Sequence, residues 1–151
     1  MEQRWSVIRR RKRLRAALIV MILVMAGLIA GAAVRYTSGR AVRVSGNEER
    51  LEFLSSLGWK AEAEPLSEQI ILLPKVFPDV LKEYNELQKK QGFDLERYAG
   101  KEVTMFTYRL LNYPAEGDVQ CSLYQYRDRI VGGDIHSVAI DGFMTALRDR
   151  T

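Results

Sequence analysis

The sequence contains only one histidine and one cysteine in 151 residues. A single histidine, His136, excludes a metal site built on two or more histidines. A single cysteine, Cys121, excludes an internal disulfide, so the folded part must be stabilised by its core unless two chains join through this thiol. Because Cys121 lies in a run of alternating apolar residues, we expect a buried and unreactive thiol. No nucleophile elbow, phosphate-binding glycine loop or zinc-ligand pair is present, and we expect no cofactor, no metal and no enzymatic activity.

A net positive charge is absent from residues 35–151, although the whole chain carries a formal net charge of +4. Residues 1–15 hold seven arginines and lysines against one acid, a net charge of +6, which leaves −2 for residues 35–151. A nucleic-acid-binding domain needs arginine and lysine clustered on its folded surface. The basic character therefore belongs to the N-terminal head, and we expect no nucleic-acid partner.

Residues 16–34 form an uncharged apolar run of 19 residues, the length of helix that crosses a hydrocarbon core of about 30 Å. Because basic residues flank only its N-terminal end, the positive-inside rule predicts a single-pass helix with head 1–15 in the cytoplasm. Residues 35–43 are predicted to form a stalk outside the cell membrane, and the lipid bilayer is a predicted partner. A cleaved signal peptide is the competing interpretation, since residues 30–32 are all small. The length of the run exceeds the usual apolar region of a signal peptide, about 7–15 residues, and favours an anchor.

Residues 44–151 are predicted to form one extracytoplasmic domain that begins with a helix over 47–57. Leucines recur at every third position of this helix, and Gly58 follows it where a left-handed residue is expected. Ser45 or Asn47 is the predicted N-cap.

A second helix is predicted over 77–87, where apolar side chains fall on one helical face. Pro78 suits its first turn and Gly92 its end. Residues 93–100 are predicted to hold one short turn capped by Asp94.

Five strands are predicted, over 59–64, 68–73, 102–112, 118–126 and 129–139. Apolar and charged residues alternate in 59–64, and Pro74 closes the strand over 68–73. Arg127 and Asp128 suggest a tight hairpin between the last two strands, while Gly132 and Gly133 suggest a bulge or a close backbone approach. A brief final helix is predicted over 141–147. The order of elements predicts an α+β fold, with a mainly antiparallel sheet of about four to five strands and two or three helices packed on it.

Two acids near glycines are candidates for acid–base chemistry together with His136, or for binding a cation. Asp134 follows the glycine pair, and Asp141 precedes Gly142. Structural roles explain both acids equally well or better, with Asp134 as the outward member of an alternating strand and Asp141 as a helix N-cap. A partly exposed sheet histidine is the simpler interpretation of His136.

Tyrosines are numerous in the second half of the chain, and arginines are interleaved with them. We take Tyr124, Tyr126, Arg127 and Arg129 as a candidate partner-binding patch, because tyrosine and arginine are enriched at protein interfaces. Ordinary β-propensity together with packing of the second helix on this face is the alternative explanation, and we favour it.

Three segments resemble one bacterial family, and the resemblance extends over roughly residues 45–147. The segments are SGNEERLEFLSSLGWKAEAEP, YNELQKKQGFDLERYAGK and IVGGDIHSVAIDGFM, with the pairs Gly58-Trp59 and Gly132-Gly133 among their recognisable positions. The chain resembles domain-of-unknown-function family 4830, small single-anchor exported proteins of clostridia-like bacteria. Members of that family tend to carry Asp-Gly at the hairpin turn, where this chain has Asp128-Arg129. The resemblance implies an exported, membrane-tethered domain and supplies no activity and no site residues.

The leading functional hypothesis is a non-catalytic binding module in the cell envelope, whose partner is another envelope protein or a cell-wall component. One alternative is an envelope hydrolase that uses Asp134 with Asp141 or His136. Another is a sensor, which would have to act through a partner because residues 1–15 are too short for an output domain.

Overall fold

The computed structural model describes residues 42–114, 117–139 and 141–149, all within the second of two units, Gly39–Thr151. The predicted head, the span 16–34 and most of the predicted stalk lie outside the described residues. Within the described part of the chain, no helix is both long and apolar enough to cross a membrane.

The described elements form an antiparallel five-stranded sheet with two α-helices and one 3-10 helix. In chain order they are α2 (Asn47–Ser56), β1 (Ser67–Leu72), α3 (Asp79–Lys90), η1 (Leu95–Tyr98), β2 (Glu102–Arg109), β3 (Val119–Tyr126), β4 (Arg129–Ser137) and β5 (Met144–Ala146). The strands lie in the order β1-β2-β3-β4-β5, so each pairs with its neighbour in sequence. The predicted α+β class and antiparallel sheet are confirmed.

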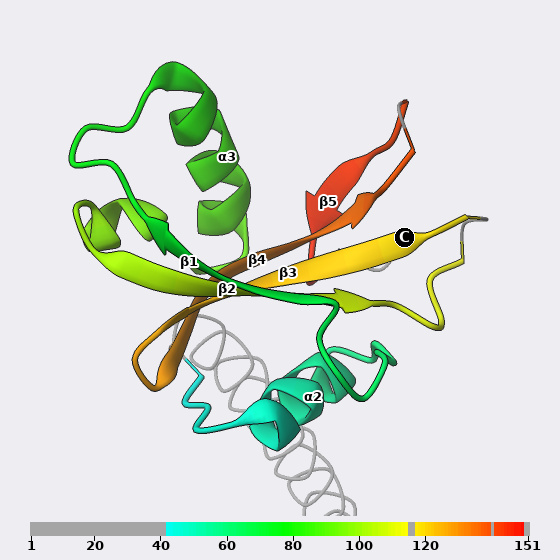
Figure 1. The fold of residues 1–151 in the computed structure, drawn as a ribbon. Helices are drawn as coiled ribbons and strands as arrows, with labels where there is room; N and C mark the ends of the chain where they lie inside the picture. The colour runs from blue at the N-terminus through cyan, green and yellow to red at the C-terminus, as the bar shows by residue number, and fades with distance from the viewer. Residues whose placement is uncertain (1–41, 115–116, 140, 150–151) are drawn as a thin grey trace, which may run out of the picture. The chain divides into compact units, whose positions relative to one another are not determined.

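The helices cover opposite faces of the sheet, with α2 on one side and α3 with η1 on the other (Figure 1). Strand β3 shows how the sequence produces two cores, because successive side chains of a strand point to opposite faces. Cys121 and Leu123 pack in the core beneath α2, together with Leu54. Tyr124 and Tyr126 lie on the α3 face. The two faces predicted for this strand are confirmed.

The glycine pair in β4 combines both features suggested by the sequence. The β3–β4 register shifts beside Gly132, which marks a bulge. A Cβ atom on Gly132 would lie 2.9 Å from Leu95 Cδ2, and one on Gly133 would lie 2.6 Å from the Ser122 carbonyl oxygen. Side chains therefore cannot fit here without displacing the neighbouring strand or η1.

Three local predictions are wrong. Residues 59–64 do not form a strand, because only Ala61 makes a β-bridge, to Leu110 beyond the end of β2. The predicted final helix over 141–147 contains β5 instead, which pairs along the free edge of β4. The N-cap of α2 is Gly46 rather than Ser45 or Asn47, and no side chain caps this end.

Candidate functional site

Buried amide side chains of α3 and of its C-cap residue, Gln91, fix the helix against β4. The Gly133 N–H donates to Gln88 Oε1 at 2.9 Å, and Gln91 Nε2 donates to the Gly133 carbonyl at 3.0 Å. The other end of the same amide, Gln91 Oε1, accepts from the Leu147 N–H at 2.8 Å. Because Gly132 has no side chain, α3 can approach the backbone of β4 closely enough for these bonds, since a Cβ atom on Gly132 would lie 3.2 Å from Gln88 Oε1. This contact places Tyr84, one turn earlier in α3, over the side chains of β4.

A buried carboxylate in β4 joins a tyrosine and the histidine. Asp134 is 2% exposed. Its Oδ2 accepts from the Tyr84 hydroxyl at 2.5 Å, and its Oδ1 lies 2.8 Å from His136 Nδ1. We call these three residues the carboxylate cluster. A buried carboxylate requires such partners, since desolvating an unpaired charge is costly.

The contacts within the carboxylate cluster shift two pKa values. The hydrogen bond with Asp134 raises the pKa of His136, and this effect outweighs the opposing effect of burial. Burial, followed by the negative charge of Asp134, raises the pKa of Tyr84 well above its ordinary value. Tyr84 therefore remains a neutral donor, while the imidazole of His136, with 25% of its side chain exposed, is the titratable member that solvent can reach.

An apolar groove of about 660 Å³ lies between α3 and β5, beside the carboxylate cluster. Helix α3 contributes Val80, Leu81, Tyr84 and Leu87, while β3 contributes Tyr124 and β5 contributes Met144. Tyr84 and Tyr124 meet edge to face with their ring centroids 6.1 Å apart. Concave apolar surfaces bearing a few polar groups are the usual form of binding sites.

A smaller hollow of about 300 Å³ lies at the β3–β4 hairpin. Tyr98, Tyr126, Arg127, Asp128 and Arg129 line it. The Tyr98 and Tyr126 rings pack with centroids 5.2 Å apart, and the Arg127 guanidinium lies 5.2 Å from the centre of the Tyr126 ring. Arg127 adopts a positive φ of 53° at the turn, and the predicted two-residue hairpin is confirmed.

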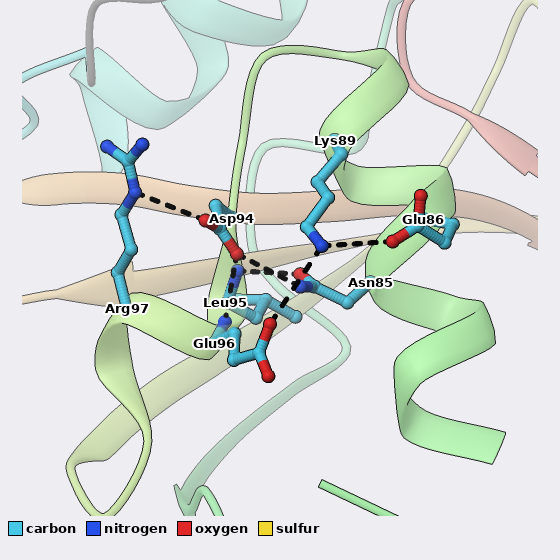
Figure 2. A network of polar contacts seen from close by, with 7 residues as sticks. All are labelled: Asn85, Glu86, Lys89, Asp94, Leu95, Glu96 and Arg97. Carbon is cyan, nitrogen blue, oxygen red and sulfur yellow. Dashed lines mark hydrogen bonds and ion pairs between the residues drawn. The ribbon is translucent and has the colours of Figure 1, made fainter. Parts of the chain in front are cut away.

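A polar network ties η1 to the end of α3 (Figure 2). Asn85 donates to Asp94 Oδ1 at 2.9 Å and accepts from the Leu95 N–H at 2.8 Å. Arg97 contacts Asp94 Oδ2 at 3.1 Å, and Lys89 contacts Glu86 at 2.9 Å. Partial burial raises the pKa of Asp94, but hydrogen bonds, first from Asn85, outweigh burial and lower it. Both cations already contact carboxylates, so the network acts as a structural clamp.

The remaining candidates for chemistry are the thiol of Cys121 and groups of side chains that could hold a metal ion. Cys121 is buried and free, and burial, more than the charge of Asp134, raises the pKa of its thiol to about 12. The expected burial of this thiol is confirmed, and a thiol that stays protonated is a poor nucleophile. Over the described ranges, no group of three or more His, Cys, Asp or Glu side chains is arranged to hold a metal ion.

The structure divides the residues singled out from the sequence into two sites. Tyr124 lies in the groove, whereas Tyr126, Arg127 and Arg129 lie around the hairpin hollow. Tyr124 and Tyr126 are half-buried under α3 and η1.

The acids predicted from the sequence lie apart. Asp134 comes together with His136, and its prediction as an outward strand residue is wrong because α3 covers this face of β4. Asp141 is exposed, and its prediction as a helix N-cap is wrong because the described residues 142–149 contain no helix.

Sequence reasoning missed Tyr84 as a partner of Asp134 and Met144 as a wall of the groove. The amphipathic pattern of α3 marks Tyr84 as inward-facing, but nothing local pairs it with a residue 50 positions away. Met144 was assigned to a helix, and only the β4–β5 pairing brings it to the groove.

The fold and the groove define a small α+β domain whose antiparallel sheet is covered by a helix on each face. The family model described as a domain of unknown function, DUF4830, matches residues 53–135. The chain belongs to this family. No curated protein and no solved structure matches the chain.

Proposed function

We propose that this chain is a single-pass membrane protein whose domain, residues 44–151, lies outside the cytoplasmic membrane and binds another envelope protein. The membrane location is supported by the 19-residue apolar run and its basic N-terminal flank. The binding role is supported above all by the groove between α3 and β5. A sensor that signals through such a bound partner is a variant of the same proposal.

The groove exposes more apolar surface than helix packing requires. Val80 is 80% exposed and Met144 is 55% exposed, on opposite sides of the same groove. Clustered exposed apolar side chains on a folded domain commonly mark interaction sites, because their burial against a partner releases ordered water. Apolar side chains of a protein partner therefore fit this surface better than a polysaccharide does.

Photocrosslinking in intact cells tests this site. A photoreactive amino acid at Val80 of the full chain should capture one partner, and Met144→Asp on the opposite wall should reduce that adduct about tenfold or more. The matched controls use Leu111, which is 61% exposed and lies outside the groove. A photoreactive residue at Leu111 should not capture the partner. The Leu111→Asp change should not reduce the adduct that forms at Val80. An adduct that survives Met144→Asp would rule out the groove as the docking site.

A second candidate function is acid–base catalysis at the carboxylate cluster. The Asp134–His136 contact of 2.8 Å favours it, because a carboxylate that orients one imidazole nitrogen leaves the other free to exchange a proton. Asp141 takes no part in this arrangement. Hydrolysis of cell-wall fragments that is lost in His136→Asn and retained in Tyr98→Phe would favour this function over binding.

A further inference from the structure

We infer that the β3–β4 hairpin carries a second, separate site, which binds the anionic headgroups of the membrane that holds the chain. We call Arg43, Tyr98, Tyr126, Arg127 and Arg129 the hairpin surface. The inference rests on the membrane anchoring in the proposed function, but it uses none of the groove between α3 and β5.

The hairpin is bonded to the first described residues of the chain. The Ile130 N–H donates to the Val42 carbonyl at 2.9 Å, and the Val44 N–H donates to the Asp128 carbonyl at 2.8 Å. Arg43 forms a β-bridge with Arg129. The chain therefore enters the domain at the hairpin surface and at no other edge of the sheet.

Chain length keeps this point of entry near the membrane. Seven residues, 35–41, separate the end of the predicted span at Val34 from Val42. Even a fully extended chain of this length reaches only roughly 25–30 Å. A tether of this kind holds the hairpin surface at a high effective concentration relative to the lipid headgroups.

The hairpin surface has a surplus of positive charge. The side chains of Arg43 and Arg129 are 75% and 49% exposed, and Arg127 is exposed as well. Asp128 is the carboxylate that contacts them, at 3.6 Å from Arg43 Nε and 3.8 Å from Arg129 Nε. One exposed carboxylate cannot neutralise three guanidinium groups. This local surplus stands out because residues 35–151 are net acidic.

Tyrosine and arginine together suit a headgroup layer. The hollow between Tyr98, Tyr126 and the two hairpin arginines measures about 300 Å³ and opens beside these rings. Tyrosine is enriched at the level of the headgroups because its ring is apolar and its hydroxyl is polar. Arginine presents several donors to a phosphate, and each basic residue near an anionic surface strengthens binding by roughly fivefold.

Lipid photolabelling of the full chain tests this inference. The chain is reconstituted into phosphatidylcholine vesicles with or without phosphatidylglycerol, and each lipid is supplied in a photoreactive form. Photoreactive phosphatidylglycerol should label the hairpin surface, and the triple change Arg43→Gln, Arg127→Gln and Arg129→Gln should lower this labelling about tenfold or more. The arginine-to-lysine triple variant should retain most of the labelling, because the charge remains.

The matched control removes three exposed lysines elsewhere, with Lys60→Gln, Lys82→Gln and Lys90→Gln. Photoreactive phosphatidylglycerol should label the hairpin surface of this control variant as strongly as that of the unchanged chain. Equal labelling by both lipids, or equal loss in the lysine control, would overturn the inference. If alkaline carbonate extracts the unchanged chain from the vesicles, the proposed anchoring fails and the inference fails with it. If the chain resists extraction but the hairpin stays unlabelled, only the inference fails.

Discussion

At the scale of single residues, Asp134 organises the α3 face of the sheet. Its two carboxylate oxygens have different partners, Tyr84 and His136, one from the covering helix and one from its own strand. A charged group at 2% exposure must have such partners. The same arrangement links the fold to pH, because the hydrogen bond with Asp134 raises the pKa of His136 while the hydroxyl of Tyr84 remains protonated.

His136→Asn should lower the free energy of unfolding by about 1–2 kcal/mol at acidic pH. The folded-state pKa of His136 is raised above its ordinary value of 6.5. The stabilisation is therefore complete below about pH 6.5 and is lost as the pH rises through the folded-state pKa. Urea unfolding of the two proteins at about pH 5.5 and pH 9 measures the difference. A gap between the two proteins that widens as the pH rises would contradict this assignment of the charged pair.

At the scale of secondary-structure elements, α3 packs through amides as well as through apolar side chains. Gln88 and Gln91 bond backbone groups of β4 and the residue after β5, which would otherwise be buried without partners. Buried backbone groups require hydrogen bonds. This helix therefore completes the hydrogen bonding of the sheet as well as covering its surface, and its position relative to β4 is set by bond geometry.

Gln91→Met should lower the free energy of unfolding by about 3 kcal/mol, because the Leu147 N–H and the Gly133 carbonyl lose their partner in a buried site. Denaturant unfolding gives the energy, and amide hydrogen exchange at Leu147 should become faster. Gln69→Met on the exposed surface of β1 is the matched control and should change stability by less than about 0.5 kcal/mol. Similar losses in both variants would show that the amide bonds of Gln91 contribute little.

At the scale of the whole molecule, charge and hydropathy separate the chain into a basic head, an apolar run that we predict to be an anchor, and a mildly acidic remainder. Residues 1–15 carry a net charge of +6, whereas residues 35–151 carry −2. We propose that the groove binds a protein partner and that the hairpin surface binds lipid. The groove uses Tyr124 of the candidate partner-binding patch, and the hairpin surface uses Tyr126, Arg127 and Arg129. Variants in one surface should therefore leave binding at the other unchanged.

Two arginines placed in the predicted span, Leu23→Arg with Val24→Arg, should abolish membrane association that resists alkaline carbonate. Each arginine at the centre of a membrane helix costs about 3 kcal/mol. The control, Ile70→Arg with Leu72→Arg, places the same charge on side chains that are 73% and 66% exposed in β1, and should leave the chain in the membrane. The intact mass of the membrane-bound chain tests the signal-peptide alternative, since cleavage would remove the head.

Local signals in the sequence predicted much of the fold. Gly58 and Gly92 take the positive φ values expected after a helix end. The alternation in β3 predicted correctly which side chains face α2 and which face α3. These features depend on neighbours in sequence, so they can be read from a few adjacent residues. The strand predicted over 59–64 is wrong because alternation is a local pattern, and it does not show whether a neighbouring strand is there to pair with.

The sequence by itself determined the charge division of the chain, the hairpin turn, the glycines that follow α2 and α3, and the order of most strands along the chain, because each depends on short-range chemistry. Only the tertiary structure decided that α3 covers Asp134, that Tyr84 meets it from 50 positions away, and that residues 144–146 form a strand. Burial depends on what packs over a face, and strand pairing depends on which edge is free. Both are long-range properties, and they bring Tyr124 and Met144 into one groove beside the carboxylate cluster.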